Sequence, residues 1–455
     1  MDLSRLMTRS TKSKPWGIKA ARIMNAALKA VDPRSAVQNS MKRMDDIIEV
    51  NSNTYDLKSI NRVLLVGAGK AGQPMVSAVQ KILGTRLADG YVIVKEGYAN
   101  KVDAADPVEI IEAGHPVPDS RGVTGAEKII HLLENTKPDD LVICLISGGG
   151  SALMVSPVKG VTLQDLQSLT GVLLESGATI NEINILRKHL DRVKGGQIAR
   201  YASPAKLICL ILSDVVGDPL DVIASGPTVP DPSTFKDALS ILERYQISDQ
   251  IPLSIIDHLN QGRDGIVSET PKPGEQTFSR VNNFIVGSNN TATDAALLQA
   301  QLEGFNCSVL SNYIQGEASQ VGKVFAAILH QMADANQPLP RPACLIVGGE
   351  TTVTMQGDGF GGRNQEIALS AVRDLASLND VALITLATDG GDGLSEAAGA
   401  VVTGETYQRA KLQNMDPHTF LANNNAYNFF KPLDDLLITG PTQTNVNDLA
   451  FLFAF

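Results

Sequence analysis

The feature that most constrains the fold is a series of short, almost wholly apolar segments in the first 290 residues. Each is rich in Leu or β-branched residues, each ends in Gly, Ser or Asp, and helix-like segments lie between most of them. The six segments are residues 62–67, 91–97, 108–114, 141–147, 205–214 and 282–288. Continuous apolar strands that alternate with helices are typical of a parallel sheet covered on both faces. The pattern predicts one doubly wound α/β domain over residues 1–288.

The pattern restarts after residue 288. Further apolar segments follow at residues 343–353, 381–393, 400–404 and 436–440, and the chain ends in FLFAF. This predicts a second, smaller α/β domain with a mixed sheet over residues 289–455. Residues 18–31 have helical apolar spacing. The first fifteen residues, with basic side chains among Ser and Thr, are expected to form a solvated N-terminus.

Composition excludes several classes of partner. The net charge is −10 and there is no long Lys/Arg run, so neither nucleic acid nor an anionic membrane surface is an expected partner. No apolar run approaches the roughly 20 residues of a membrane helix. Cys144, Cys209 and Cys344 lie in apolar runs, and Cys307 lies in a shorter one. We interpret the four as reduced core thiols, which predicts a reducing compartment and a cytoplasmic location.

Glycine-rich loops follow the predicted strands, where ligands bind in open α/β sheets. GAGKAG (67–72) follows the first strand, and SGGGS (147–151) follows the fourth. Glycines let backbone N–H groups approach a ligand, and successive N–H groups form a cradle for phosphate or carboxylate. A tight turn is the alternative for any single loop. The predicted cradle consists of Gly67, Gly69, Ser147, Gly148, Gly149, Gly150 and Ser151.

Two cations lie inside such loops. Lys70 lies within GAGKAG, where its charge would face a ligand bound by the glycine-rich loop. In a kinase, a lysine in such a position neutralises phosphoryl oxygens. Arg363 lies between a glycine pair and a predicted helix start, which suits bidentate anion binding. The alternatives are a solvated helix-start lysine and a surface salt bridge. We predict that both cations stabilise a transferring phosphoryl group.

Four carboxylates accompany these loops: Asp214, Glu350, Asp389 and Asp392. Such groups suit Mg²⁺ binding or acceptance of a substrate hydroxyl proton, although each could equally cap a helix or a turn. Lys194, beside two glycines, could face a cleft. Asn184, Arg187, Lys188 and His189 are interpreted as surface residues of a helix, and His115 as a residue held in a Pro-rich loop.

The chain resembles the class II glycerate kinase family, also called the glycerate 2-kinase or MOFRL family, from about residue 18 to the C-terminus. The resemblance rests on ISGGGSAL, NILRKHLDRVKGGQIA, LILSDVVGDPLDVIASGPTVPDPSTF, GGRNQEIALS, TDGGDG and TGPTQTNVNDL. It implies ATP-dependent phosphorylation of D-glycerate at the 2-hydroxyl, giving 2-phosphoglycerate, with Mg²⁺. It also implies a Rossmann-like N-terminal domain, a smaller α/β domain, an active site in the cleft between them and a homodimer.

The family's proposed catalytic lysine and arginine fall on Lys70 and Arg363, and we add Asp214 to this catalytic set. Asp389 and Asp392 are the predicted metal ligands. The predicted substrate- and phosphate-binding set includes the cradle and also Lys194, Asn289, Glu350, Asn364 and Glu366. The chain departs from the family pattern at Gly391, Leu394–Ser395–Glu396 and Gln443. These departures bear on the choice of substrate more than on the type of reaction.

Two other functions compete with the kinase. GAGKAG fits the dinucleotide fingerprint G-x-G-x-x-G, with Glu96 near the end of the second strand, which would suit an NAD(P)-dependent reductase of hydroxypyruvate or tartronate semialdehyde. Lys70 inside the fingerprint and the anion-binding loops elsewhere argue against it. A non-catalytic sensor of sugar acids or phosphorylated sugars is the second alternative, because SGGGS also resembles sugar-phosphate loops. The charged side chains spread over both domains argue against this passive binder.

Overall fold

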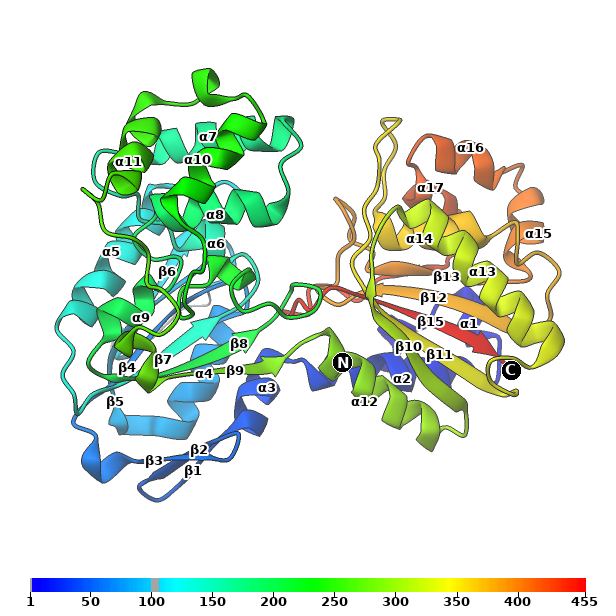
Figure 1. Ribbon diagram of the computed structural model, residues 1–455. Coiled ribbons are helices and arrows are strands. Elements are labelled where there is room, and N and C mark those ends of the chain that lie inside the picture. Colours follow the sequence, from blue (N-terminus) through cyan, green and yellow to red (C-terminus); the bar gives the residue numbers. More distant parts are fainter. Residues whose placement is uncertain (1, 100–105) are drawn as a thin grey trace. The chain divides into compact units, whose positions relative to one another are not determined.

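The computed structural model describes residues 2–99 and 106–455 (Figure 1). The chain forms two compact units, one of Ala36–Val286 and one of Met1–Ser35 together with Gly287–Phe455. Each unit is described by itself. This division differs from the predicted ranges 1–288 and 289–455 mainly in the first 35 residues, which pack with the C-terminal part of the chain.

The first unit, Ala36–Val286, contains the predicted six-stranded sheet. Its strand order is β6-β5-β4-β7-β8-β9, and the neighbouring strands from β6 to β8 are parallel. β4 and β7, the first and fourth of these strands along the chain, therefore lie side by side. The strand order in the sheet runs in opposite directions on the two sides of this pair. The strands are β4 (Val63–Ala68), β5 (Leu87–Lys95), β6 (Val108–Ala113), β7 (Leu141–Ile146), β8 (Lys206–Leu212) and β9 (Val281–Gly287).

Helices cover both faces of this sheet. Gly72 of α4 (Gly72–Leu83) lies against Val92 and Val94, whereas Gly125 of α5 (Ser120–Glu134) lies against Ile93. Successive strand residues point to opposite faces, so α4 and α5 lie on opposite faces of the sheet. The doubly wound prediction is confirmed.

Two parts of this unit were not predicted. An antiparallel sheet precedes β4, formed by β1 (Met41–Met44), β2 (Ile47–Val50) and β3 (Asn53–Asp56). A helical layer with its own apolar core, which includes Leu186, Phe235 and Leu259, forms beyond the sheet. Its helices are α7 (Leu163–Glu175), α8 (Ile180–Leu190), α10 (Phe235–Arg244) and α11 (Leu253–Arg263). The short helices of the unit are α3 (Pro33–Ser40), α6 (Gly150–Leu153) and α9 (Gln197–Ala202).

The second unit has the predicted mixed sheet, in the order β10-β11-β15-β12-β13-β14. β11 and β12 both run antiparallel to β15, with Asp448 in register with Gly349 on one side and Ala387 on the other. The carboxyl ends of β11 and β12 and the start of β15 therefore share one edge. The strands are β10 (Asn306–Ile314), β11 (Ala343–Gly349), β12 (Val381–Ala387), β13 (Gly399–Thr403), β14 (Leu436–Leu437) and β15 (Asp448–Ala454).

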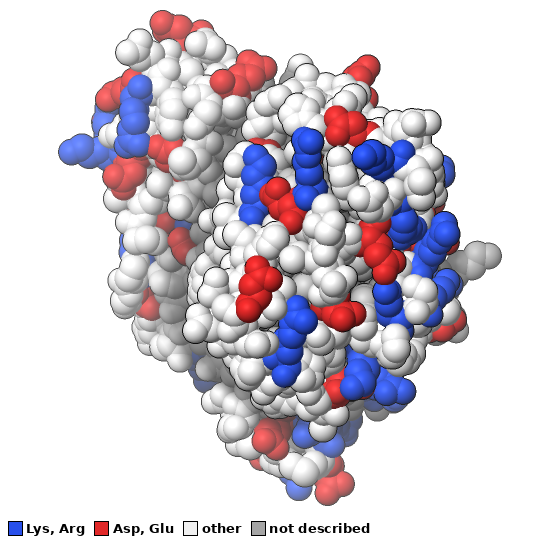
Figure 2. Space-filling model, turned by 90° about the vertical axis from the view of Figure 1, so that its right-hand side faces the viewer, with Lys and Arg blue, Asp and Glu red and all other residues white. Residues whose placement is uncertain are grey.

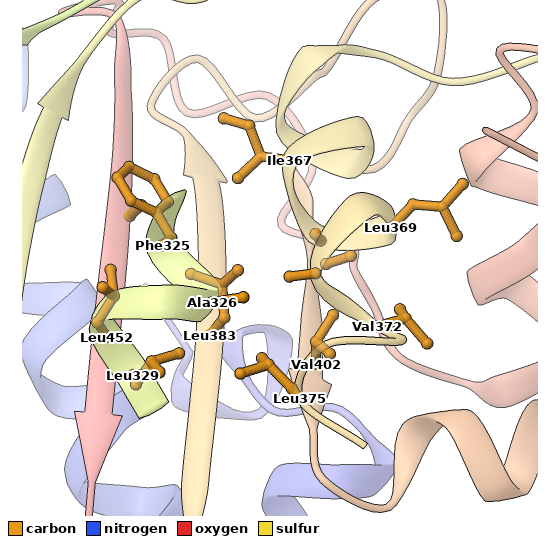
Figure 3. Packing of buried hydrophobic residues seen from close by; sticks show 14 of the residues in the cluster. Phe325, Ala326, Leu329, Ile367, Leu369, Val372, Leu375, Leu383, Val402 and Leu452 are labelled. Atoms are coloured by element: carbon orange, nitrogen blue, oxygen red, sulfur yellow. The ribbon is translucent and has the colours of Figure 1, made fainter. Parts of the chain in front are cut away.

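One face of this sheet packs on α13 (Ala318–Ala335) and α14 (Arg363–Ala371). Phe325 and Leu329 of α13 meet Ile367 of α14 and Leu383 and Leu452 of the strands in one buried cluster (Figure 3). Apolar burial of this kind is the main favourable contribution to folding. The smaller helices of the unit are α15 (Thr406–Lys411), α16 (Pro417–Ala422) and α17 (Ala426–Phe430).

The N-terminal segment belongs to the core of the second unit. Phe453 points to the face opposite Leu452 and stacks on Phe455, which in turn stacks on Trp16 with 4.1 Å between ring centroids. α2 (Gly17–Ala30) packs against α12 (Asn289–Leu302). Ser10 of α1 (Arg9–Lys12) donates its hydroxyl to Asp435 at 2.8 Å. The predicted helix over 18–31 is confirmed, but the predicted solvated N-terminus is wrong.

The surface in Figure 2 carries basic and acidic side chains interspersed over the face shown. Within the described residues, no helix combines the length and the apolar character needed to cross a membrane.

Candidate active site

The first cluster of predicted residues lies where β4 and β7 end, at the reversal of strand order. Backbone hydrogen bonds join the two glycine-rich loops: Lys70 N–H donates to the Gly148 carbonyl at 2.9 Å, and Ser147 N–H donates to the Ala68 carbonyl at 3.1 Å. Ala71 N–H donates to Ser147 Oγ at 3.0 Å. Ligands bind at such a switch point in open α/β sheets. The structure therefore brings the predicted cradle together with Lys70.

Glycine is required here because the backbones approach closely. A Cβ atom on Gly67 or Gly69 would overlap the β7 backbone or Ser147. Gly149 has φ +82°, and a Cβ there would lie 2.8 Å from Cδ2 of His115 and 3.5 Å from Cγ of Lys70. His115, which follows β6, thus lies over the SGGGS loop beside Lys70. We did not predict this position.

Three titratable side chains meet at this loop. Gly148 lies in contact with the Asp214 carboxylate. Burial raises the pKa of Asp214, and the positive charge of Lys70 opposes that shift. Burial, together with Lys70 and Lys95, lowers the pKa of His115 to about 4. Across the residues that the structure describes, the Lys70 ammonium makes no hydrogen bond or ion pair, so it is available to an anionic ligand.

Two neighbouring residues have structural partners. Ser151 Oγ lies 2.9 Å from Ser225 Oγ, and that hydroxyl donates to Asn184 Oδ1 at 3.0 Å. Lys194 donates to Asp191 Oδ2 at 2.6 Å and to the Met154 carbonyl at 2.8 Å. Burial lowers the pKa of Lys194 and raises that of Asp191. The Lys194 ammonium is thus committed to a buried ion pair, and its predicted phosphate contact stays a prediction.

The second cluster lies in the other unit, at the edge where β11, β12 and β15 meet. Arg363 Nε donates to Asp448 Oδ2 at 2.5 Å, Nη2 donates to Asp448 Oδ1 at 3.3 Å, and Nη1 lies 3.1 Å from Glu350 Oε1. An arginine has five N–H donors, so some remain for a ligand. Burial disfavours the charged form of the Arg363 guanidinium and lowers its pKa. The carboxylates of Asp448 and Glu350 outweigh this effect, so the pKa of Arg363 is raised.

Asp392 caps α14. Its two carboxylate oxygens accept from the backbone N–H groups of Asn364 (3.2 Å) and Gln365 (2.9 Å) and from both side-chain amides. Burial, and then the neighbouring charge of Asp448, raises the pKa of Asp392 to about 7. Asp392 therefore caps a helix, which was the alternative to its predicted role as a metal ligand. Asp389 accepts from Gly391 N–H at 3.2 Å through one oxygen, so its other oxygen remains a possible ligand atom.

The other predicted residues of this unit surround the same edge. Asn289 donates to the Val446 and Asp448 carbonyls at 2.9 and 3.0 Å. Asn289 Oδ1 and Asn364 Oδ1 are buried without a hydrogen-bond partner in the described part of the chain. Glu366, Glu350 and Arg363 line a cavity of about 600 Å³, and Asn424 donates to Glu366 at 2.8 Å.

Several functional candidates were missed. Asp448 contacts or neighbours most members of the second cluster. It begins the antiparallel strand β15, so the rule that ligands bind at the carboxyl ends of parallel strands gave no reason to select it. Arg187 and Asn184 were interpreted as surface residues, but Asn184 is buried and Arg187 is partly buried. The GHP sequence directly after β6 was the only local signal for His115.

Fold and site together define an α/β protein whose glycine-rich loops meet at the carboxyl ends of its parallel strands. Two family models match the chain: a domain of unknown function (DUF4147) over residues 19–260 and the MOFRL family over residues 343–448. The chain belongs to the class II glycerate kinase family.

Individual relatives span nearly the whole chain. The glycerate 2-kinase of Pyrococcus horikoshii is 41% identical over 94% of this chain and 95% of its own length. The crystal structure of the Thermotoga maritima glycerate kinase is 40% identical, with a TM-score of 0.86 over 96% of this chain and 99% of that chain. A relative from Agrobacterium vitis, 40% identical over 94% of this chain and 92% of its own length, carries the provisional name of a hydroxypyruvate reductase.

Proposed function

We propose that this protein is an ATP-dependent kinase that phosphorylates D-glycerate at the 2-hydroxyl, giving 2-phosphoglycerate and ADP. The observation that carries the proposal is the Lys70 ammonium, which has no hydrogen bond or ion pair within the described residues and lies beside two loops whose backbones are joined. Such a cation beside a glycine cradle suits a phosphoryl group, which develops charge on its peripheral oxygens during transfer. The named glycerate kinases among the relatives support the same reaction.

Asp214 is the proposed proton acceptor. It lies against Gly148 at the same loop, and burial raises its pKa. A carboxylate of raised basicity accepts a hydroxyl proton better than an ordinary one. In this proposal the 2-hydroxyl of glycerate gives its proton to Asp214 as its oxygen bonds to the γ-phosphorus of ATP. The bond between that phosphorus and the bridging oxygen breaks, and ADP leaves.

Arg363 is the proposed second cation. Asp448 and Glu350 hold the guanidinium in one orientation and leave N–H donors for a phosphate oxygen. Lys70 and Arg363 belong to different units. The role of each residue is therefore a separate part of the proposal, which a variant of each residue tests.

Magnesium enters the proposal as the ion that neutralises the nucleotide phosphates when it is bound. Asp392 does not fit the predicted role of ligand, because both of its oxygens cap α14. Asp389 keeps an oxygen that fits. No group of three or more candidate metal-ligating side chains occurs within residues 2–99 and 106–455.

Glu96 weakens the reductase alternative. A dinucleotide site uses an acidic side chain after the second strand to bind the ribose, but Glu96 Oε2 lies 2.8 Å from Arg121 Nη2. Two of the fingerprint glycines, Gly67 and Gly69, instead make the close approach of β4 to β7 possible.

A product assay tests the proposal. Purified protein is given D-glycerate, ATP and Mg²⁺, and an enolase-coupled readout detects 2-phosphoglycerate but not 3-phosphoglycerate. We expect a signal that depends on all three additions. No signal, together with NADH consumption on hydroxypyruvate, would establish the reductase instead.

A further inference from the structure

Arg187 of α8 is a partly buried arginine. Its guanidinium makes no hydrogen bond and no ion pair to any residue that the structure describes. The nearby carboxylate, Asp191, is already bound by Lys194 at 2.6 Å and by two backbone N–H groups. Burial lowers the pKa of Arg187, with Asp191 only partly opposing the shift. Within the described residues, the charge of Arg187 is therefore only partly compensated.

α8 lies beside the segment that begins at the last residue of the SGGGS loop. Asn184 reaches Ser151 through Ser225, and Asp191 accepts from Ser156 N–H at 3.2 Å. The segment from Ser151 to Ser156 thus runs alongside the helix between these two contacts. Arg187 lies midway between Asn184 and Asp191 on the same side of the helix, three residues after the one and four before the other.

Side chains of a helix lean toward its N-terminus, so a long side chain at residue 187 leans toward Asn184, Ser225 and Ser151. Ser225 has φ +61° and Ala224 has φ +50°, conformations that cost energy for residues other than glycine. The Ser225 carbonyl accepts from Gly195 N–H at 2.9 Å, which helps to hold the strained segment in place. Strained segments occur preferentially at ligand sites, and this one fixes Ser225 between Ser151 and Asn184.

We infer that Arg187 binds an oxyanion of the substrates at the Ser151–Ser225 end of the SGGGS loop, opposite the Lys70 end. The ligand chemistry is a planar carboxylate or a phosphate, which the guanidinium fork can bind through two N–H groups. D-Glycerate supplies the carboxylate and the nucleotide supplies the phosphate. The identity of the ligands rests on the proposed function.

The test compares Arg187→Met with Arg192→Met. Methionine keeps much of the apolar volume and removes the charge. Arg192 is the matched control, because its guanidinium is paired with Glu127 at 2.6 Å. Calorimetry measures binding of D-glycerate and of ADP separately, and thermal unfolding is followed without ligand. Wild-type protein is measured first, and a wild type that binds neither ligand would refute the proposed function before Arg187 is tested.

We expect Arg187→Met to weaken binding of one ligand on the order of 10- to 100-fold, the loss typical of a charge-assisted hydrogen-bonded pair. The Tm of the free protein should stay the same or rise, because a partly buried charge with only partial compensation has been removed. Weaker glycerate binding would identify the substrate carboxylate as the group that Arg187 binds. Weaker ADP binding would identify a nucleotide phosphate as that group. Arg187→Lys should recover part of the loss, and Arg192→Met should leave both affinities unchanged.

Two results would overturn the inference. One is wild-type affinity for both ligands in Arg187→Met. The other is a fall in the Tm of the free protein with both affinities reduced alike, because a residue that only supports the fold gives that pattern.

Discussion

Lys70 and Lys194 show why residue type alone does not define a role. Both lie beside glycines, and both were predicted to bind phosphate. Lys194 is buried against Asp191, whereas Lys70 has no hydrogen-bonded or ionic partner in the described residues. The sequence places a cation beside a loop, but only the fold decides whether a carboxylate already neutralises it.

The buried pair predicts the stability of one variant. Lys194→Met should lower the free energy of unfolding by about 3–5 kcal/mol, because it leaves the Asp191 carboxylate buried and unpaired. Lys159→Met, at an exposed lysine, should change it by less than about 0.5 kcal/mol. Urea denaturation measures both. Equal effects of the two substitutions would contradict the buried pair.

His115 predicts a pH dependence. In the unfolded chain its imidazole takes up a proton near its ordinary pKa of 6.5, but in the folded protein only near pH 4. Between these values the unfolded state binds more protons, so the free energy of unfolding falls as pH falls from 6.5 toward 4. Above pH 6.5 the imidazole is neutral in both states, so the full contribution of His115 to the free energy of unfolding is present.

The measurement is urea denaturation at pH 7.5 and pH 5. His115→Gln removes the titrating group and should lose less stability between these pH values than the wild type. An identical loss in both proteins would show that His115 titrates normally.

At the scale of elements, burial explains what could be predicted. The central strands β4, β7 and β8 of the first sheet are buried almost throughout and form continuous apolar runs. β1 reads Met-Lys-Arg-Met and is only partly buried, so it has no comparable signal. The edge strand β10 alternates between exposed and half-buried positions. Asp448 was missed because its place beside Arg363 depends on the antiparallel register of β15.

The loop after β7 offers a test with a matched control. Gly149 and Gly160 both have positive φ, +82° and +91°, but a Cβ on Gly160 meets nothing within 4 Å. Substitution by alanine at either position should cost roughly 1–2 kcal/mol of stability. Only Gly149→Ala should also displace His115, which lies beside Lys70, and we expect this to lower kcat/KM about 100-fold. Equal activity of the two variants would contradict the site.

At the scale of the whole molecule, the N-terminal segment completes the C-terminal unit. Deletion of residues 2–35 would uncover Phe455, on which Trp16 stacks. We expect limited proteolysis of the deletion variant to cleave first within residues 287–455 and to leave 36–286 protected. Deletion of residues 2–4 is the control. Wild-type protection of 287–455 in the longer deletion would disprove this packing role.

The two-unit organisation could be predicted because the strand pattern restarts. The unit to which residues 1–35 belong could not be predicted, because the sequence of a single amphipathic helix does not indicate which sheet it covers. The catalytic proposal depends on one residue from each unit, so its decisive test compares both.

The most direct measurement is the steady-state rate of 2-phosphoglycerate formation by wild type, Lys70→Met and Arg363→Met, with Tm recorded for each. The account predicts a fall in kcat of about 100- to 1000-fold for Lys70→Met with little change in Tm, because its ammonium stabilises the transferring group and makes no hydrogen bond or ion pair within the described residues. Arg363→Met should lose activity to a similar extent but also some stability, because Asp448 would lose its partner. Wild-type activity in Lys70→Met would contradict the central claim.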